Sequence, residues 1–299
     1  MDGVPKIEKI LFATRLGEMA FNSLETLFVL KAAGLREIVL CHIIPREDVG
    51  FVPFGGYLRK EAERLRQEAG IKFEDWRQAI SGAGIESRIV IEVGAPAQDV
   101  AGIALREQAD LLVIGRGGRI GPLAGSHTLG ILRRCRVPVL VHRYLARFEA
   151  EGEIAVKENR LVFEKPLLAA DWSPASDRAL SFLVSMAGAV EKAGVVHVID
   201  EKALLGPDLE NTRQQLLTRL RQRYCDTIER AGMKAEAHIA AGQPAREIIE
   251  TARSIGAGMI IAGATGKEKP EGPALGSVSH RLCEISEFPV LLVPAVDAR

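Results

Sequence analysis

The chain has 299 residues, of which 47% are hydrophobic, so it can bury a large core, and its length suggests about two domains. Lys and Arg together number 39, as do Asp and Glu, and a formal net charge of zero argues against broad attraction to nucleic acid or to an acidic membrane. The start, MDGVPKIEKILFA, lacks the features of a signal peptide, and no apolar run approaches the ~20 residues of a membrane span. We therefore expect a cytoplasmic protein.

The first half alternates apolar runs with amphipathic stretches, and the apolar runs predict five strands. They cover Lys9–Thr14, Glu37–Ile43, Glu86–Val93, Ala109–Gly115 and Val137–His142. Between them, Tyr57–Ala83 carries Glu, Arg and Gln at helical spacing, and Pro96–Gln108 begins with a proline suited to a first helical turn. Most of the runs are unbroken Val, Ile and Leu, as expected for parallel strands covered on both faces.

The second half follows the same plan. Its predicted strands cover Pro166–Ala170, Val195–Asp200, Lys234–Ala240, Gly258–Gly263 and Phe288–Val293. Ser173 followed by Pro174 predicts a helix start, with the serine as cap and the proline in the first turn. The segment 143–165 connects the halves, and its apolar residues suggest a short helix or strand of its own.

The two halves are copies of one another, which the spacing of short matching segments shows. VGAPA at 93–97 matches AGQPA at 241–245 with an offset of 148, and QADLLVIGRGG faces GAGMIIAGATG at the same offset. After the glycines the offset becomes 151, where GPLAGS faces GPALGS and VPVLV faces FPVLL. A duplicated domain whose loop is three residues longer in the second copy explains both offsets.

This alternation predicts an α/β fold with two tandem doubly wound domains, each a five-stranded parallel sheet with helices on both faces. We place the domains at residues 1–145 and 160–299. In such sheets ligands bind at the carboxyl ends of the strands, where the strand order reverses. In the second copy Asp171, the strand end 198–200 and the loop after Gly263 converge there. Asp171 is then either an acceptor for a nucleoside or a solvated turn residue.

The stretch Ile260–Ser279, IIAGATGKEKPEGPALGSVS, breaks from an apolar run into a glycine-rich loop and resumes as a helix. Gly263, Gly266 and Gly276 let the backbone approach a ligand, and Ser277 stands where a helix begins, with NH groups suited to phosphate. The alternative is an ordinary turn with Ser277 as the helix cap. Because neither a Walker A sequence nor GxGxxG is present, P-loop hydrolysis and dinucleotide binding are disfavoured.

The second copy resembles the universal stress protein family in several motifs. The order Gly263, two residues, Gly266, nine residues, Gly276, Ser277 is similar to the G-2x-G-9x-G-[S/T] nucleotide motif of that family. DWSPASDRAL resembles its TDxSxxSxxAL opening, and HVID at 197–200 and FPVLLV resemble its second and last strands. The resemblance spans both copies and implies a tandem protein with an adenine nucleotide alpha hydrolase-like fold.

The resemblance implies ATP, with or without Mg²⁺, as the ligand of the second copy. Asp171 would meet the adenosine, Ala169 would line the base pocket, and Val198 would offer its backbone to adenine. The other implied contacts are Ala262, Gly263, Thr265, Gly266, Gly276, Ser277, Val278 and Ser279. By position, Ala262 and Gly263 would pack against the nucleoside, and Gly266 would make room for the ribose and phosphates. The residues from Gly276 to Ser279 would hold the phosphate chain. Thr265 and Lys267 would assist.

The first copy departs from this pattern at two positions. Arg15 stands where the second copy has Asp171, and the loop Gly118–Gly125 has six intervening residues instead of nine. We predict that the first site is degenerate or binds something different. Arg116 and Arg119 would then be either phosphate contacts or solvated surface arginines, of which the second is the commoner case.

The hypothesis is a stress-response protein that binds ATP in its second half and acts as a regulatory or sensing module. The alternatives are a slow, at most weak, ATPase without an identified catalytic group, and a scaffold that binds no nucleotide. The resemblance also implies an intrachain pseudo-dimer, because the terminal strand pairs domains in that family. A homodimer and an unknown protein partner are further possibilities. The scattered cysteines, Cys41, Cys135, Cys225 and Cys283, predict reduced small hydrophobes, and the six histidines show no metal-ligand spacing, so we expect no metal centre.

Overall fold

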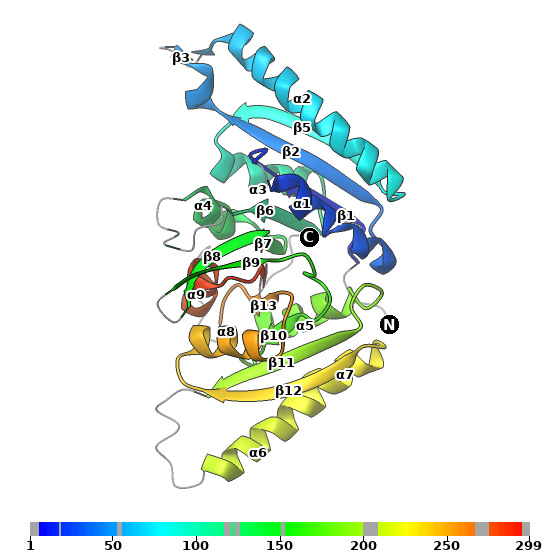
Figure 1. Cartoon of the computed structure of the whole chain (residues 1–299), viewed down its shortest axis with the longest axis vertical. Coiled ribbons are helices and arrows are strands. Elements are labelled where there is room, and N and C mark those ends of the chain that lie inside the picture. Colours follow the sequence, from blue (N-terminus) through cyan, green and yellow to red (C-terminus); the bar gives the residue numbers. More distant parts are fainter. Residues whose placement is uncertain are drawn as a thin grey trace.

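The computed structural model describes residues 6–17, 19–52, 56–116, 121, 123, 126–150, 153–199, 209–266 and 275–294. Within these residues a ten-stranded sheet has the order β12-β11-β10-β13-β14-β7-β6-β1-β2-β5. This order runs along the long axis of the molecule, from β5 at one end to β12 at the other (Figure 1). Both sequence copies therefore contribute to one continuous sheet.

Each copy supplies five parallel strands in the same order. In the first copy they are β1 (Lys9–Ala13), β2 (Glu37–Pro45), β5 (Glu86–Gly94), β6 (Leu111–Gly115) and β7 (Val139–His142). In the second copy they are β10 (Leu167–Ala169), β11 (Lys192–Ile199), β12 (Lys234–Ala241), β13 (Ile260–Gly263) and β14 (Val290–Val293). The third, second, first, fourth and fifth strands follow one another in space, so the prediction of two tandem doubly wound domains is confirmed.

The last strands of the two copies join the half-sheets. β7 and β14 run antiparallel, with Leu140 opposite Leu291 and Val139 opposite Leu292. All four side chains are buried, because each faces one of the helix layers that cover the sheet. This strand pair makes the hydrophobic core continuous from one domain to the other.

Helices cover both faces of the sheet. One face carries α1 (Ala20–Glu25), α2 (Arg59–Gly82), α5 (Pro174–Val184), α6 (Leu209–Leu220) and α7 (Asp226–Arg230). The other carries α3 (Pro96–Arg106), α4 (His127–Arg134), α8 (Pro244–Ser254) and α9 (Ser277–Ile285). Strand side chains alternate between the layers: Ile10 and Phe12 of β1 pack under α1 and α2, whereas Leu11 and Ala13 pack under α3 and α4.

The described residues also form several shorter elements. They are the 3₁₀ turns η1 (Phe28–Ala33) and η2 (Arg46–Val49), the π turn η4 (Arg221–Cys225) between α6 and α7, and the hairpin of β3 (Phe51–Val52) with β4 (Gly56–Tyr57). The connecting segment forms the antiparallel pair β8 (Leu145–Ala150) and β9 (Glu153–Glu158). Of the two possibilities given for this segment, the structure therefore selects strands.

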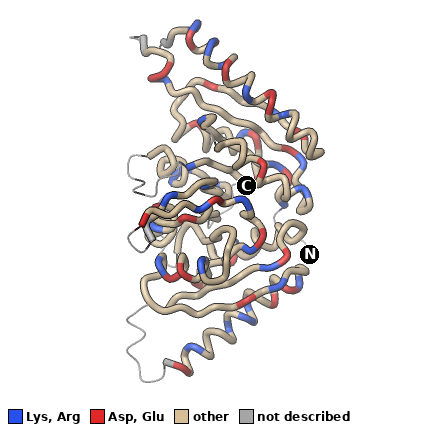
Figure 2. The backbone as a smooth tube through the Cα atoms, viewed as in Figure 1, with Lys and Arg blue, Asp and Glu red and all other residues tan. Residues whose placement is uncertain are grey.

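Acidic and basic residues are interspersed along the exposed helices (Figure 2). On α2, Arg77 contacts Glu74 at 3.0 Å and Arg64 pairs with both Glu61 and Glu68. Such exposed pairs contribute little to stability, but they keep the two signs of charge mixed. No helix in the described part of the chain is long and apolar enough to cross a membrane.

Candidate functional site

The predicted site residues of the second domain lie where the strand order reverses. β10 and β13 are neighbours, with Leu168 opposite Ile261, so Ala169 at the end of β10 lies beside Ala262, the last residue but one of β13. Ala169, Val198 and Ala262 all contact the core layer formed by α8 and α9, and Val278 of α9 packs into the same layer. The sheet thus brings the small apolar residues of the predicted base pocket to one face of its carboxyl edge.

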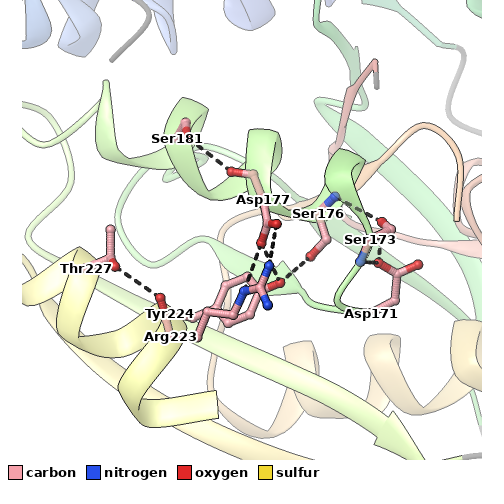
Figure 3. Close-up of polar contacts among 8 residues, drawn as sticks. All are labelled: Asp171, Ser173, Ser176, Asp177, Ser181, Arg223, Tyr224 and Thr227. Atoms are coloured by element: carbon pink, nitrogen blue, oxygen red, sulfur yellow. Dashed lines mark hydrogen bonds and ion pairs between the residues drawn. The ribbon is translucent and has the colours of Figure 1, made fainter. Parts of the chain in front are cut away.

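An ordered turn holds Asp171 beside this edge. Its Oδ1 accepts hydrogen bonds from the backbone NH of Ser173 at 3.0 Å and from the Ser173 hydroxyl at 2.5 Å (Figure 3). The Ser173 Oγ in turn accepts from the NH of Ser176 at 3.1 Å, which confirms Ser173 as the cap of α5. Asp171 is therefore part of a hydrogen-bonded helix start rather than a merely solvated turn residue.

The second carboxylate oxygen of Asp171 faces the glycine-rich loop. A Cβ atom added to Gly266 would lie 3.2 Å from Asp171 Oδ2. The loop ends meet close by, because the NH of Gly276 donates to the carbonyl of Ala264 at 2.8 Å. A Cβ on Gly276 would lie 3.4 Å from that same carbonyl oxygen. Both glycines therefore occupy positions where the backbone approaches other groups closely.

Gly263 is required for a different reason. A Cβ at this position would lie 2.7 Å from the Cβ of Ala175 and 3.0 Å from the carbonyl carbon of Ala175, both in the first turn of α5. Glycine here lets α5 pack onto the end of β13. The motif thus contains one glycine that the helix packing needs and two that shape the loop.

α9 begins at Ser277, as the sequence predicted, but the residue in the cap position differs from the prediction. Gly276 occupies the N-cap position and no side chain accepts a hydrogen bond there, so the prediction that Ser277 caps the helix is wrong. Ser277 is the first helical residue and is exposed. Two residues later, Ser279 is buried and its hydroxyl donates to the carbonyl of Gly263 at 2.6 Å. That bond ties the helix to the strand end and leaves the NH groups of its first turn at the loop.

Aromatic residues not singled out from the sequence brace the Asp171 turn. Trp172 has a left-handed backbone with φ of 66°, and its indole donates to His197 Nε2 at 3.2 Å. His197 Nδ1 therefore carries the proton and donates to the carbonyl of Ala170 at 2.7 Å. The guanidinium of Arg219 lies 4.6 Å above the Trp172 ring. The position of Trp172 directly after Asp171 could have indicated this role. Its partners could not be found from the sequence, because they lie on α6 and β11.

A polar cluster fixes the outer side of α5. Asp177 accepts from Arg223 at 2.6 Å and from the Tyr224 hydroxyl at 3.2 Å, and the Ser176 and Tyr224 hydroxyls lie 3.0 Å apart (Figure 3). Burial raises the pKa of Tyr224 to about 12, which keeps its hydroxyl protonated as a donor. Because both Tyr224 and Arg223 lie in the π turn η4, this turn anchors the helix whose start holds Asp171.

The first domain uses the matching positions differently. Arg15 is exposed at the end of β1, in the place of Asp171. Arg116 is not a solvated surface residue, because its guanidinium donates to the carbonyls of Gly121 and of Cys283 on α9. Its role as a phosphate contact stays a prediction. Arg119, like Lys267 and Asp200 of the second domain, lies outside the described residues.

Three of the cysteines are buried side chains of the core. Burial raises the pKa of the Cys41 and Cys283 thiols to about 12, so both behave as small hydrophobes, and none of the four cysteines is in a disulfide. Within the described ranges, no group of three or more His, Cys, Asp or Glu residues gathers as metal ligands would. The arrangement around Asp171 is one of hydrogen-bond acceptors, helix NH groups and small apolar walls.

Comparison with known proteins agrees with this architecture. The sequence model described as "Universal stress protein family" matches residues 6–143 and again residues 163–294. The chain belongs to the universal stress protein family. The resemblance stated for both copies is therefore confirmed, and family membership supports a role in stress response.

Individual relatives cover one copy or both. A universal stress protein of Methanocaldococcus jannaschii is 27% identical over 151 residues, which are 45% of this chain and 93% of the relative. One of Mycolicibacterium smegmatis is 27% identical over 270 residues, 86% of each chain. The solved structure of a universal stress protein from Archaeoglobus fulgidus superimposes with a TM-score of 0.71 at 21% identity and covers 97% of this chain and 99% of its own. The tandem arrangement of the fold thus recurs in a solved relative.

Proposed function

We propose that this chain binds ATP in its second domain and acts as a regulatory or sensing module of the stress response. The observation that carries the proposal is the approach of Gly266 to Asp171 Oδ2, where an added Cβ would lie 3.2 Å from the carboxylate. A backbone position without a side chain next to an acceptor carboxylate suits a nucleotide that binds beside both groups.

The surrounding groups divide between the two ends of such a ligand. Asp171 Oδ2 accepts from a ribose hydroxyl, since Oδ1 already accepts two hydrogen bonds from Ser173. Ala169 and Val198 border the space for the base. The NH groups at the start of α9, with Ser277 exposed beside them, face the phosphates, where the positive end of the helix favours negative charge.

The role that follows is conformational. Nucleotide in contact with β10, β11 and the loop after β13 joins elements that belong to different parts of the second domain. This shifts the chain between states only if the nucleotide binds one state more tightly than the other. We propose at most weak ATP hydrolysis, and phosphate release measured with and without Mg²⁺ separates a binder from an ATPase.

Isothermal titration of the full chain with ATP tests the site. Wild type should bind one ATP per chain, and Gly266→Ala should bind at least about tenfold more weakly because its Cβ enters the space beside Asp171. Gly121→Ala is the matched control, since a Cβ on this loop glycine of the first domain would meet nothing within 4 Å. Unchanged ATP affinity in a Gly266→Val, Gly276→Val double variant would refute the assigned site.

We further propose that the protein acts in the cytoplasm. The supporting observation is its cysteine chemistry: Cys41, Cys225 and Cys283 are buried and free, and burial raises the pKa of each thiol. Free buried thiols are typical of proteins from a reducing compartment. Fractionation of the producing cells, with detection of the full chain in each fraction, tests this location.

A further inference from the structure

The first domain contains a cavity at the carboxyl ends of its strands. Its volume is about 340 Å³, and its lining comes from β1, β2, β6, α3 and α4. Among the lining residues, Arg15 and Gly115 align with Asp171 and Gly263 of the second domain. The cavity therefore lies at the reversal of strand order in the first domain, and its size is that of a small-molecule site.

The cavity has an apolar interior. Cys41 of β2, Ile114 of β6 and Val100 of α3 line it, and each of these side chains is at most 4% exposed. Burial raises the pKa of the Cys41 thiol to about 12, so that wall carries no thiolate. An apolar part of a ligand would lose contact with water here, which is the main source of affinity for such groups.

The mouth of the cavity is basic. Arg15 lies there together with Arg116 and with His127 and Thr128 at the start of α4. Ser126 caps this eight-residue helix by accepting from the NH of Leu129 at 3.2 Å. The residues that line the cavity include no carboxylate. Two guanidinium groups and the positive end of a helix therefore surround an opening that suits one negative group.

This arrangement does not suit the ligand proposed for the second domain. Arg15 offers donors where Asp171 offers an acceptor, so a ribose hydroxyl has no carboxylate there to accept its proton. The loop is held elsewhere: the NH of Gly121 donates to the carbonyl of Glu284 at 3.2 Å, and the NH of Leu123 donates to the Glu284 carboxylate at 3.2 Å. Both contacts hold described residues of the loop against α9 of the second domain.

We propose that the first domain binds a small amphiphilic anion, with one carboxylate or phosphate monoester head on an apolar body. The head lies between Arg15 and the first turn of α4, and the body lies against Cys41, Val100 and Ile114. This site does not depend on ATP binding in the second domain, because none of the residues assigned to that site lines the cavity.

Calorimetric titration of the full chain with octanoate and octyl phosphate, each below its aggregation concentration, tests the proposal. One ligand should bind per chain, and hexanoate should bind more weakly than octanoate by about fourfold for each methylene removed. Octanol, which has the same body without the charge, should bind about tenfold more weakly than the tighter of the two anions. Whichever anion binds more tightly identifies the head group as a carboxylate or a phosphate, and either result supports the site.

Three variants locate the binding. Arg15→Gln, an exposed substitution that should leave the fold intact, should weaken both anions about tenfold. Arg133→Gln removes the same charge from an exposed position of α4 outside the cavity lining and should leave both affinities unchanged. Val100→Phe should fill the cavity and abolish binding, provided that its circular dichroism spectrum is native.

Two results would overturn the proposal. The first is equal affinity for octanol and for the tighter of the two anions, or an Arg15→Gln variant that binds both anions as wild type does, because the basic mouth would then contribute nothing. The second is that neither octyl anion binds the full chain. If ATP binding is also lost in Arg15→Gln, the cavity is a second nucleotide site instead. If ATP fails to bind the second domain, the octyl titrations still support or overturn the proposal in the same way.

Discussion

Gly115→Ala and Gly263→Ala form a matched pair of substitutions, because these glycines end the fourth strand of each copy at equivalent positions. A Cβ on Gly263 would lie 2.7 Å from the Cβ of Ala175 and 3.1 Å from the carbonyl oxygen of Thr265. A Cβ on Gly115 would meet nothing within 4 Å. The same substitution therefore places a methyl group in a crowded position in the second domain and in open space in the first.

The magnitude follows from which atoms collide. Contacts below 3.0 Å are essentially never seen for a real Cβ, so either the first turn of α5 or the end of β13 must move in Gly263→Ala. Overpacking of this kind costs about 1–3 kcal/mol, and we expect about 2 kcal/mol less unfolding free energy. Gly115→Ala should be neutral or stabilise by up to about 1 kcal/mol, because alanine lowers the entropy of the unfolded chain.

Urea titration of both variants, followed by far-ultraviolet circular dichroism, measures the difference. The slope against urea should stay that of wild type, so that a shifted midpoint reports stability alone. If the unfolding free energies of the two variants agree within about 0.5 kcal/mol, the packing of α5 is not the reason for Gly263. In that case the whole glycine motif would have to be explained by the loop.

Three further predictions concern other parts of the molecule. Asn159→Ala should lower the free energy of unfolding by about 1–3 kcal/mol, because this buried amide donates to two backbone carbonyls at 2.7 and 2.8 Å. The control Leu161→Ala, at a residue 67% exposed, should lower it by less than about 0.5 kcal/mol. Equal losses for the two variants in urea titrations would contradict this. Burial lowers the pKa of His142 from 6.5 to about 3, so between these pH values the unfolded chain binds a proton at this residue and the folded chain does not. The free energy of unfolding should therefore fall by about 1.4 kcal/mol for each pH unit below 6.5, down to about pH 3. A His142→Gln variant should lose that part of the pH slope in denaturation series, and an unchanged slope would show that the residue does not titrate this way. If ATP binds beside Asp171, Trp76→Phe should keep an ATP-dependent fluorescence change and Trp172→Phe should lose it, and the reverse pattern would place the nucleotide elsewhere.

The arrangement of the sheet could be predicted because its causes are local and repeated. Unbroken apolar runs set the strands, and the repeat offset fixed which strands correspond. The closeness of Asp171 to the glycine-rich loop could also be predicted, since adjacent parallel strands end at one edge of the sheet. These features needed only strand identity and the general topology of doubly wound sheets.

The helix starts after the loops could not be predicted equally well. GPLAGS and GPALGS end in the same two letters, yet Ser126 caps α4 by accepting from the NH of Leu129, whereas Ser277 lies inside α9 and Gly276 takes the cap position. A cap depends on the backbone angles at a single residue, and the longer second loop enters its helix one residue earlier. Sequence identity of the motif does not determine those angles.

The role of the first loop depends on contacts that are distant in sequence. Arg116 and Arg143 correspond to Ala264 and Pro294 in the repeat, and both arginines donate to one acceptor, the carbonyl of Cys283 near the end of α9. The negative end of a helix favours such cations. Alanine and proline have no group that could reach back to the first domain in this way. Both copies therefore contribute equally to the strand pair at the junction. The two arginine hydrogen bonds to the Cys283 carbonyl, by contrast, are donated by the first copy. Arg116 thus has a structural role in joining the domains.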